Sequence, residues 1–112
     1  MTDHELLELA AKAAGIELRW HPDGTAYSDS RCKDYWGVWN PLTDDGDALR
    51  LAVYLCLAVR LLEKCVFVES NPDTLLSFSS VSEMEMYAGD PYAATRRAIV
   101  RAAAVASGVL ES

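Results

Sequence analysis

The stretch from Asn40 to Leu62 constrains the fold of this chain most strongly, because it contains a turn, an acidic helix start and a long apolar run. Thr43 or Asp44 can cap a helix, and the acidic residues that follow occupy the first turn, where the helix dipole favours negative charge. The next apolar side chains would leave only a narrow polar stripe on a helix; they are Leu49, Leu51, Ala52, Val53, Leu55, Cys56, Val59 and Leu62. A helix of this kind has to be covered by the rest of the domain. We therefore predict a central helix from about Asp44 to Leu62, and we expect its burial to be the largest single contribution to stability.

Two further helices are predicted, one at each end of the chain. Residues 3 to 14 place leucines and alanines near one face, and Gly15 is a natural stop. Near the other end, Asp90 can cap a helix in which Pro91 takes the first position. That helix is predicted to run to about Ala106, with an alanine-rich inner face.

Two hairpins are predicted between these helices. Apolar and polar side chains alternate from Ile16 to His21, and a turn at residues 22 to 24 leads to a short returning strand at residues 25 to 28. Residues 65 to 69 and 75 to 81 form a second strand pair around a turn at residues 71 to 73. Hairpins imply antiparallel pairing. The predicted class is therefore α+β: an α/β/α sandwich in which three helices cover an antiparallel sheet of about four strands, with two-layer packing left open.

Size and charge limit the possible functions. A chain of 112 residues is long enough for one compact domain spanning residues 1–112. The formal net charge of -7 opposes binding to a nucleic-acid backbone or to an anionic membrane. The longest apolar run is shorter than the roughly 20 residues that cross a bilayer. Three cysteines without Cys-x-x-Cys spacing, after a start unlike a signal peptide, favour the cytoplasm.

Two motifs carry a family resemblance that covers nearly the whole chain. The segment from Asn40 to Ala52, together with the segment from Tyr92 to Ala104, resembles the small phage and prophage proteins grouped as the phage ABA sandwich domain. The resemblance implies an α/β/α sandwich encoded by a phage or prophage and acting in the bacterial host cell. It implies no catalytic site. Tyr54 departs from the pattern, in which an aliphatic residue or a lysine is expected.

No residue is predicted to have a catalytic, cofactor-binding or metal-binding role. The acidic residues 44 to 47 fit helix capping better than a calcium loop, which needs acids at alternating positions and a later glutamate. Cys32 beside Lys33 could be a reactive thiol, and His21 could serve as a base. We prefer a structural loop for this region, because catalysis requires a nucleophile oriented by a base and nothing in the sequence brings His21 and Cys32 together.

Two groups of residues are candidates for partner binding. Aromatic and basic residues cluster before the central helix, and both types are enriched at binding hot spots; they are Arg31, Lys33, Tyr35, Trp36 and Trp39. These rings could instead stack on bases or belong to the core. The last helix carries Arg96, Arg97 and Arg101, which could dock an acidic partner or a second copy of the chain.

The sequence thus favours a non-enzymatic phage- or prophage-encoded accessory protein that binds a host or phage protein. One concrete version is an inhibitor of a bacterial defence system, such as an anti-CRISPR, whose acidic surface would occlude a basic groove. A structural, homo-oligomeric phage component is an alternative. A small enzyme using Cys32 or His21 is another.

Overall fold

The computed structural model describes residues 2–28, 37–70 and 82–107. The helices in this part of the chain are α1 (Asp3–Ala14), α2 (Asp45–Tyr54) and α3 (Pro91–Ala106). The strands are β1 (Leu18–Trp20), β2 (Ala26–Ser28), β3 (Gly37–Val38), β4 (Leu57–Leu61), β5 (Cys65–Ser70) and β6 (Ser82–Met86). The predicted mixed α+β class is confirmed. No helix of the described residues is long and apolar enough to span a membrane.

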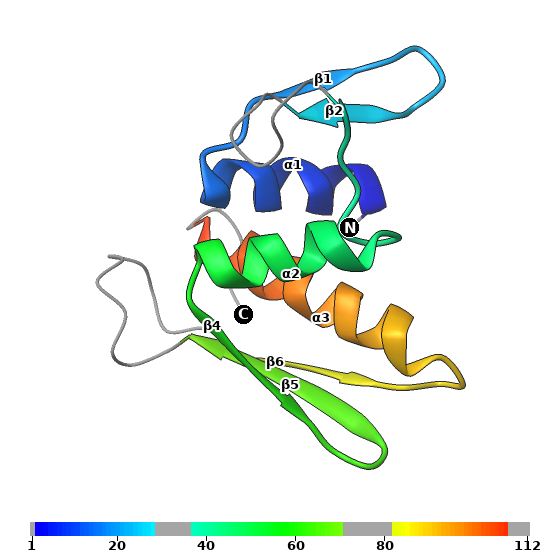
Figure 1. The fold of residues 1–112 in the computed structure, drawn as a ribbon, viewed down its shortest axis with the longest axis vertical. Coiled ribbons are helices and arrows are strands. Elements are labelled where there is room, and N and C mark those ends of the chain that lie inside the picture. Colours follow the sequence, from blue (N-terminus) through cyan, green and yellow to red (C-terminus); the bar gives the residue numbers. More distant parts are fainter. Residues whose placement is uncertain (1, 29–36, 71–81, 108–112) are drawn as a thin grey trace.

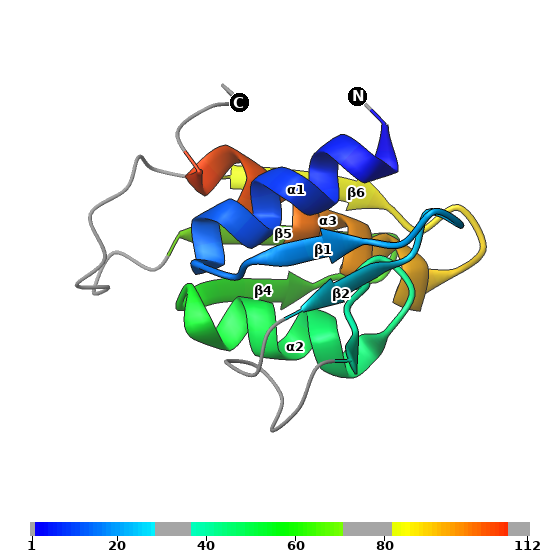
Figure 2. The same cartoon turned by 90° about the horizontal axis from the view of Figure 1, so that it is seen from above.

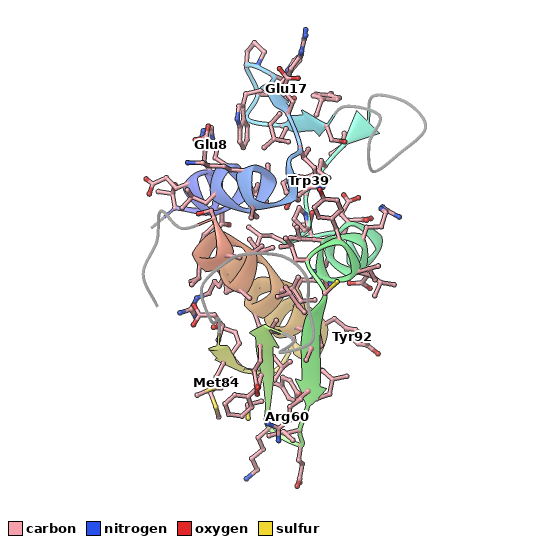
Figure 3. All side chains as sticks on the ribbon, turned by 90° about the vertical axis from the view of Figure 1, so that its left-hand side faces the viewer. Glu8, Glu17, Trp39, Arg60, Met84 and Tyr92 are labelled. Carbon is pink, nitrogen blue, oxygen red and sulfur yellow. The ribbon has the colours of Figure 1, made fainter. Side chains whose placement is uncertain are left out.

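The strands form two separate antiparallel sheets in the described part of the chain, with orders β1-β2-β3 and β4-β5-β6. Figures 1 and 3 show the helices between them: the β1–β2 hairpin lies beyond α1, and the second sheet lies beyond α3. The sequence predicted a single sheet of about four strands covered by helices. Instead, α1 packs directly on α3, and both helices bury small side chains such as Ala10, Ala98 and Ala102. Direct packing of the two helices leaves no room for a sheet between them.

The ends of α1 and α3 confirm the capping predictions. The Asp90 side chain accepts hydrogen bonds from the backbone N–H groups of Tyr92 and Ala93, and Pro91 begins α3. At α1, Gly15 adopts a positive φ of 69° after the last helical residue. Both helices have the predicted bounds, because their caps and their apolar faces agree. Figure 2 shows α1 and α3 from above.

The prediction for the central helix is wrong in its length and in its burial. Helix α2 ends at Tyr54, and residues 57 to 61 form strand β4 instead. Cys56, between them, has a positive φ of 55°, which a continuous helix cannot contain. Leu49 and Val53 on α2 are exposed. Helix α2 has four buried residues, whereas α3 has eight, so α3 is the central helix of the domain.

The first predicted hairpin is confirmed, and the strand predicted at residues 65 to 69 is present with β4 and β6 as its described partners. Strand β1 pairs with β2 as expected. Strand β5, predicted at residues 65 to 69, pairs with β4 across the connection at residues 62 to 64 and with β6 on its other side. The predicted strand at residues 75 to 81 lies outside the described residues. Val66 and Val68 of β5 are fully buried beneath α3, so this sheet contributes its central strand to the core.

Candidate binding groove

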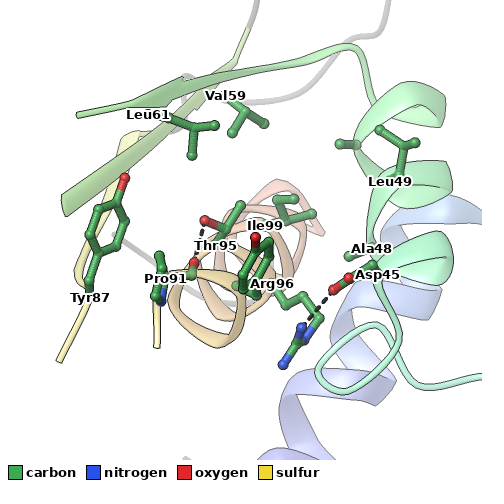
Figure 4. Close-up of a pocket in the computed structure, with 12 residues that line it drawn as sticks. Asp45, Ala48, Leu49, Val59, Leu61, Tyr87, Pro91, Thr95, Arg96 and Ile99 are labelled. Carbon is green, nitrogen blue, oxygen red and sulfur yellow. Dashed lines mark hydrogen bonds and ion pairs between the residues drawn. The ribbon is translucent and has the colours of Figure 1, made fainter. Parts of the chain in front are cut away.

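An apolar groove lies between α2, β4 and the first half of α3 (Figure 4). Its volume is about 420 Å³. Its lining is mainly aliphatic and includes two tyrosines; the lining residues are Asp45, Ala48, Leu49, Ala52, Val59, Leu61, Tyr87, Pro91, Tyr92, Thr95, Arg96 and Ile99. We call this feature the α2–β4 groove. Its size and apolar lining are typical of sites that take a ligand or a segment of another chain.

The groove exists because the helices cover the second sheet unevenly. Helix α3 packs on β5 and β6, whereas β4 lies at the edge of the sheet. Val59 and Leu61 point to the same face as the buried valines of β5, since they are their cross-strand partners. They nevertheless remain 36% and 65% exposed, and Leu49 on the opposite wall is 64% exposed. The groove is therefore an unfilled part of the space between helices and sheet.

A polar contact fixes the two helices at one end of the groove. Arg96 of α3 donates one hydrogen bond to the backbone carbonyl of Leu42, at 2.8 Å, and another to the carboxylate of Asp45, at 2.6 Å. Its side chain is mostly buried although that of Asp45 is exposed. Figure 4 shows this pair at the rim beside Ala48. Because Arg96 bonds both to the loop before α2 and to its first turn, it holds this wall against α3.

A buried carboxylate stabilises the start of α2, which forms the same wall of the groove. Asp47 is 2% exposed, and it accepts hydrogen bonds from the Asn40 N–H at 3.0 Å and from Arg50 at 2.7 Å. Its own N–H donates to the side chain of Asp44, which caps α2. The capping prediction for the acidic residues is confirmed. The buried role of Asp47 was missed, because a run of three acids and a glycine gives no sign of which acid faces inward.

Of the aromatic and basic residues predicted to bind a partner before the central helix, the structure describes Trp39 alone. Arg31, Lys33, Tyr35 and Trp36 lie outside the described residues. Trp39 is 1% exposed and is part of the hydrophobic core (Figure 3). This placement agrees with the alternative that its ring is a core residue.

The three arginines of α3 contact three different elements and do not form one stripe. Arg96 bonds to the start of α2, as described above. Arg97 pairs with Asp3 of α1 at 3.1 Å, and Arg101 pairs with Glu83 and Glu85 of β6. Of these residues, Arg96 alone is part of the groove lining. Their common effect is to tie α3 to the elements around it.

The described geometry of His21 is that of a tight turn. Its Nδ1 lies 3.2 Å from a carboxylate oxygen of Asp23, and both side chains are exposed. Hydrogen bonds from Thr25 lower the pKa of Asp23. Cys32, the other candidate of the enzymatic alternative, lies outside the described residues. Among the residues that the structure describes, no group of three His, Cys, Asp or Glu side chains is arranged to hold a metal ion.

Sequence reasoning missed the groove itself. Leu49, Val59 and Leu61 all lie within the span of the predicted central helix, and Tyr92 belongs to one of the two motifs that carry the family resemblance. The available signal was an excess of apolar residues from Leu49 to Leu62, more than one short helix in a domain of this size can bury. Tyr54, which departs from the pattern expected from the resemblance, is the exposed last residue of α2.

Comparison of the chain with protein-family models, with curated proteins and with solved structures found no match. The resemblance to the phage ABA sandwich proteins therefore stays a prediction.

Proposed function

We propose that this chain is a non-enzymatic binding protein that holds an apolar segment of a partner protein in the α2–β4 groove. The observation that supports the proposal is the exposure of three large aliphatic side chains, Leu49, Val59 and Leu61, around one concave site. Scattered exposed apolar residues are ordinary, whereas a contiguous apolar surface with a polar rim is typical of an interaction site.

The fixed walls of the groove favour binding. Each square ångström of apolar surface that a partner removes from water is worth about 25 cal/mol before the costs of association. Those costs are smaller when the site is already in its bound shape, because fewer side chains and loops have to be ordered. The contacts of Arg96 with Leu42 and Asp45 hold one end of the site in this way.

The family resemblance supplies the proposed biological setting. We propose a phage- or prophage-encoded accessory protein that acts inside the bacterial host on a host or phage protein. Inhibition of a bacterial defence system, such as an anti-CRISPR activity, is a concrete form of this role. The net charge of -7 suits a protein that competes with nucleic acid for a basic surface. No cofactor is required for such a role.

The test is affinity capture from bacterial lysate with tagged wild-type protein and two matched variants. Leu61→Asp places a charge in the groove. Met86→Asp is the control, because Met86 is similarly exposed, at 57%, but its cross-strand neighbours place it on the opposite face of the same sheet. Circular dichroism checks that both variants fold.

We expect a specific partner that the wild type and Met86→Asp retain and Leu61→Asp loses. Equal capture by all three proteins would contradict the groove as the binding site. Absence of any specific partner of the wild type in host and phage-infected lysates would contradict the proposed function as a whole.

A further inference from the structure

The two edges of the second sheet are built differently. At the β6 edge, Glu83 and Glu85 point toward α3 and pair with Arg101. Charged side chains that point inward at an edge discourage the addition of another strand, because the added strand would have to bury them. At the β4 edge the inward side chains are Val59 and Leu61, which carry no charge. Only the β6 edge therefore has this protection.

Within the part of the chain that the structure describes, the backbone of β4 has hydrogen-bonding groups without partners on its outer side. The N–H of Leu62 donates to the carbonyl of Cys65 at 2.9 Å, which sets the phase of the β4–β5 ladder. Because hydrogen-bonded pairs alternate in an antiparallel ladder, Arg60 and Ala58 bond to β5, and the N–H and C=O groups of the other strand residues point away from it. Those residues are Leu57, Val59 and Leu61. Within the described residues, β4 has β5 as its one strand neighbour, and no bond to these outward groups is found.

The open edge and the α2–β4 groove are one continuous site. Val59 and Leu61 direct their backbone groups outward from the sheet edge and their side chains into the groove. A strand placed beside β4 would extend the sheet toward the space under Leu49 of α2 (Figure 4). We propose that an extended segment of the partner protein binds here by adding to β4 as a fourth, antiparallel strand. This inference rests on the proposed function and specifies how the groove is occupied.

The register predicts the chemistry of the added segment. The segment residues opposite Val59 and Leu61 would lie on the groove side of the sheet. They are expected to be apolar, because they would displace water from the aliphatic walls of the groove. The residue between them lies opposite Arg60, on the other face. Arg60 is 62% exposed and forms an ion pair with Glu69 of β5, at 3.2 Å. An acidic residue at that position of the segment would pair with Arg60. Main-chain bonds then supply affinity, and the apolar–acidic–apolar alternation supplies selectivity.

Amide hydrogen exchange measured by NMR tests strand addition directly. The probe is a nine-residue peptide with blocked ends, valine at alternate positions, glutamate at its centre and threonine elsewhere. At a free peptide concentration ten times the dissociation constant, exchange at the amides of Leu57, Val59 and Leu61 is expected to slow about tenfold. The amides of Ala58 and Arg60 are expected to change little, because they already bond to β5. The alternation of affected and unaffected residues is the signature of a strand, and a helix seated in the groove would not produce it.

Two matched peptides serve as controls. N-methylation of the residues whose N–H groups would face β4 removes the donors without changing the side chains, and it is expected to abolish the protection. Replacing the central glutamate by lysine is expected to weaken binding at least several-fold, because the lysine would lie opposite Arg60.

Three results would overturn the proposal. In the first, the peptide shifts the NMR signals of Leu49 and Ile99 but does not slow exchange at the three amides. The groove would then bind an apolar chain in another way, which refutes strand addition and leaves the proposed function standing. Slow exchange at the same amides without peptide, in a protein that sediments as a dimer, would mean that a second copy occupies the edge. No binding at millimolar peptide would refute strand addition by segments of this class, whereas loss of the proposed function itself is judged by the capture experiment.

Discussion

Cys56 lies where α2 ends and β4 begins, and substitutions there test the boundary that creates the groove. Its φ of 55° lies in the left-handed region, where any residue with a Cβ is strained. The side chain is exposed, so its replacement removes little packing. We therefore compare Cys56→Gly with Cys56→Ala, which differ only in the presence of the Cβ.

The structure predicts that the glycine variant is the more stable of the two. Alanine keeps the left-handed strain, which costs about 1–2 kcal/mol. Glycine relieves that strain but loses more conformational entropy on folding, at a cost of about 0.4–1 kcal/mol. The net expectation is a free energy of unfolding higher by about 0.5–1 kcal/mol for Cys56→Gly. If α2 continued through Leu62, as the sequence predicts, the order would reverse, because glycine inside a helix costs about 1 kcal/mol relative to alanine.

Urea unfolding followed by circular dichroism measures this difference, and thermal unfolding provides a second readout. For a domain of this length, 1 kcal/mol corresponds to roughly 4 °C in the melting temperature. The glycine variant is therefore expected to melt about 2–4 °C above the alanine variant. An alanine variant more stable than the glycine variant by about 1 kcal/mol would refute the helix end at this position, and with it the strand that forms one wall of the groove.

Three further predictions concern the frame around the groove. Asp47→Ala is expected to destabilise the fold by about 2–3 kcal/mol in urea unfolding, because it leaves the Asn40 N–H without its acceptor; a loss below 0.5 kcal/mol would contradict the buried role of Asp47. Trp39→Ala is expected to cost about 3–5 kcal/mol in the same assay, and a loss typical of a surface residue would contradict its burial. Because its carboxylate accepts hydrogen bonds from Thr25, Asp23 is expected to titrate with a pKa below its ordinary value in carboxyl NMR. The stability that this turn contributes is present above the unfolded-state pKa and is lost as the pH falls through the folded-state pKa. Thr25→Val should raise the pKa of Asp23.

The parts of the fold that the sequence predicted correctly are those that local chemistry determines. Asp90 and Pro91 define the start of α3 whatever surrounds it, and Gly15 defines the end of α1. The first hairpin follows from strict alternation and from a proline–aspartate–glycine turn. In each case the signal lies within a few residues of the structure that it specifies.

The errors occur where the structure depends on distant contacts. A run of leucine, valine and alanine is compatible with a buried helix or with a strand, and periodicity alone does not separate them. Pairing with β5 makes Leu57 to Leu61 a strand and not part of a helix. No residue between Leu49 and Leu62 indicates that pairing in the sequence. The division into two sheets has a similar origin, since it depends on close packing of α1 against α3.

The candidate site was inaccessible to sequence reasoning for the same reason. It is formed by residues from three elements that meet only in the folded chain, and its aliphatic side chains have no distinctive chemistry. The predicted arginines were correctly placed on α3, but their partners come from α1, α2 and β6. Sequence reasoning identified the cations and could not show that acids on other elements already pair with them.

Exposure alone does not select the α2–β4 groove, because the other face of the second sheet also exposes apolar side chains at Met84 and Met86. The two surfaces differ in what a partner would gain. Methionine side chains are flexible, so ordering them against a partner costs entropy. The groove is concave, its rim is held by Arg96, and the edge beside it offers backbone donors and acceptors that have no partner among the described residues. A partner in the groove would gain directional hydrogen bonds and apolar burial together, whereas one on the Met84 face would gain burial alone. Leu61→Asp should therefore affect binding more than Met86→Asp, although the two positions are similarly exposed.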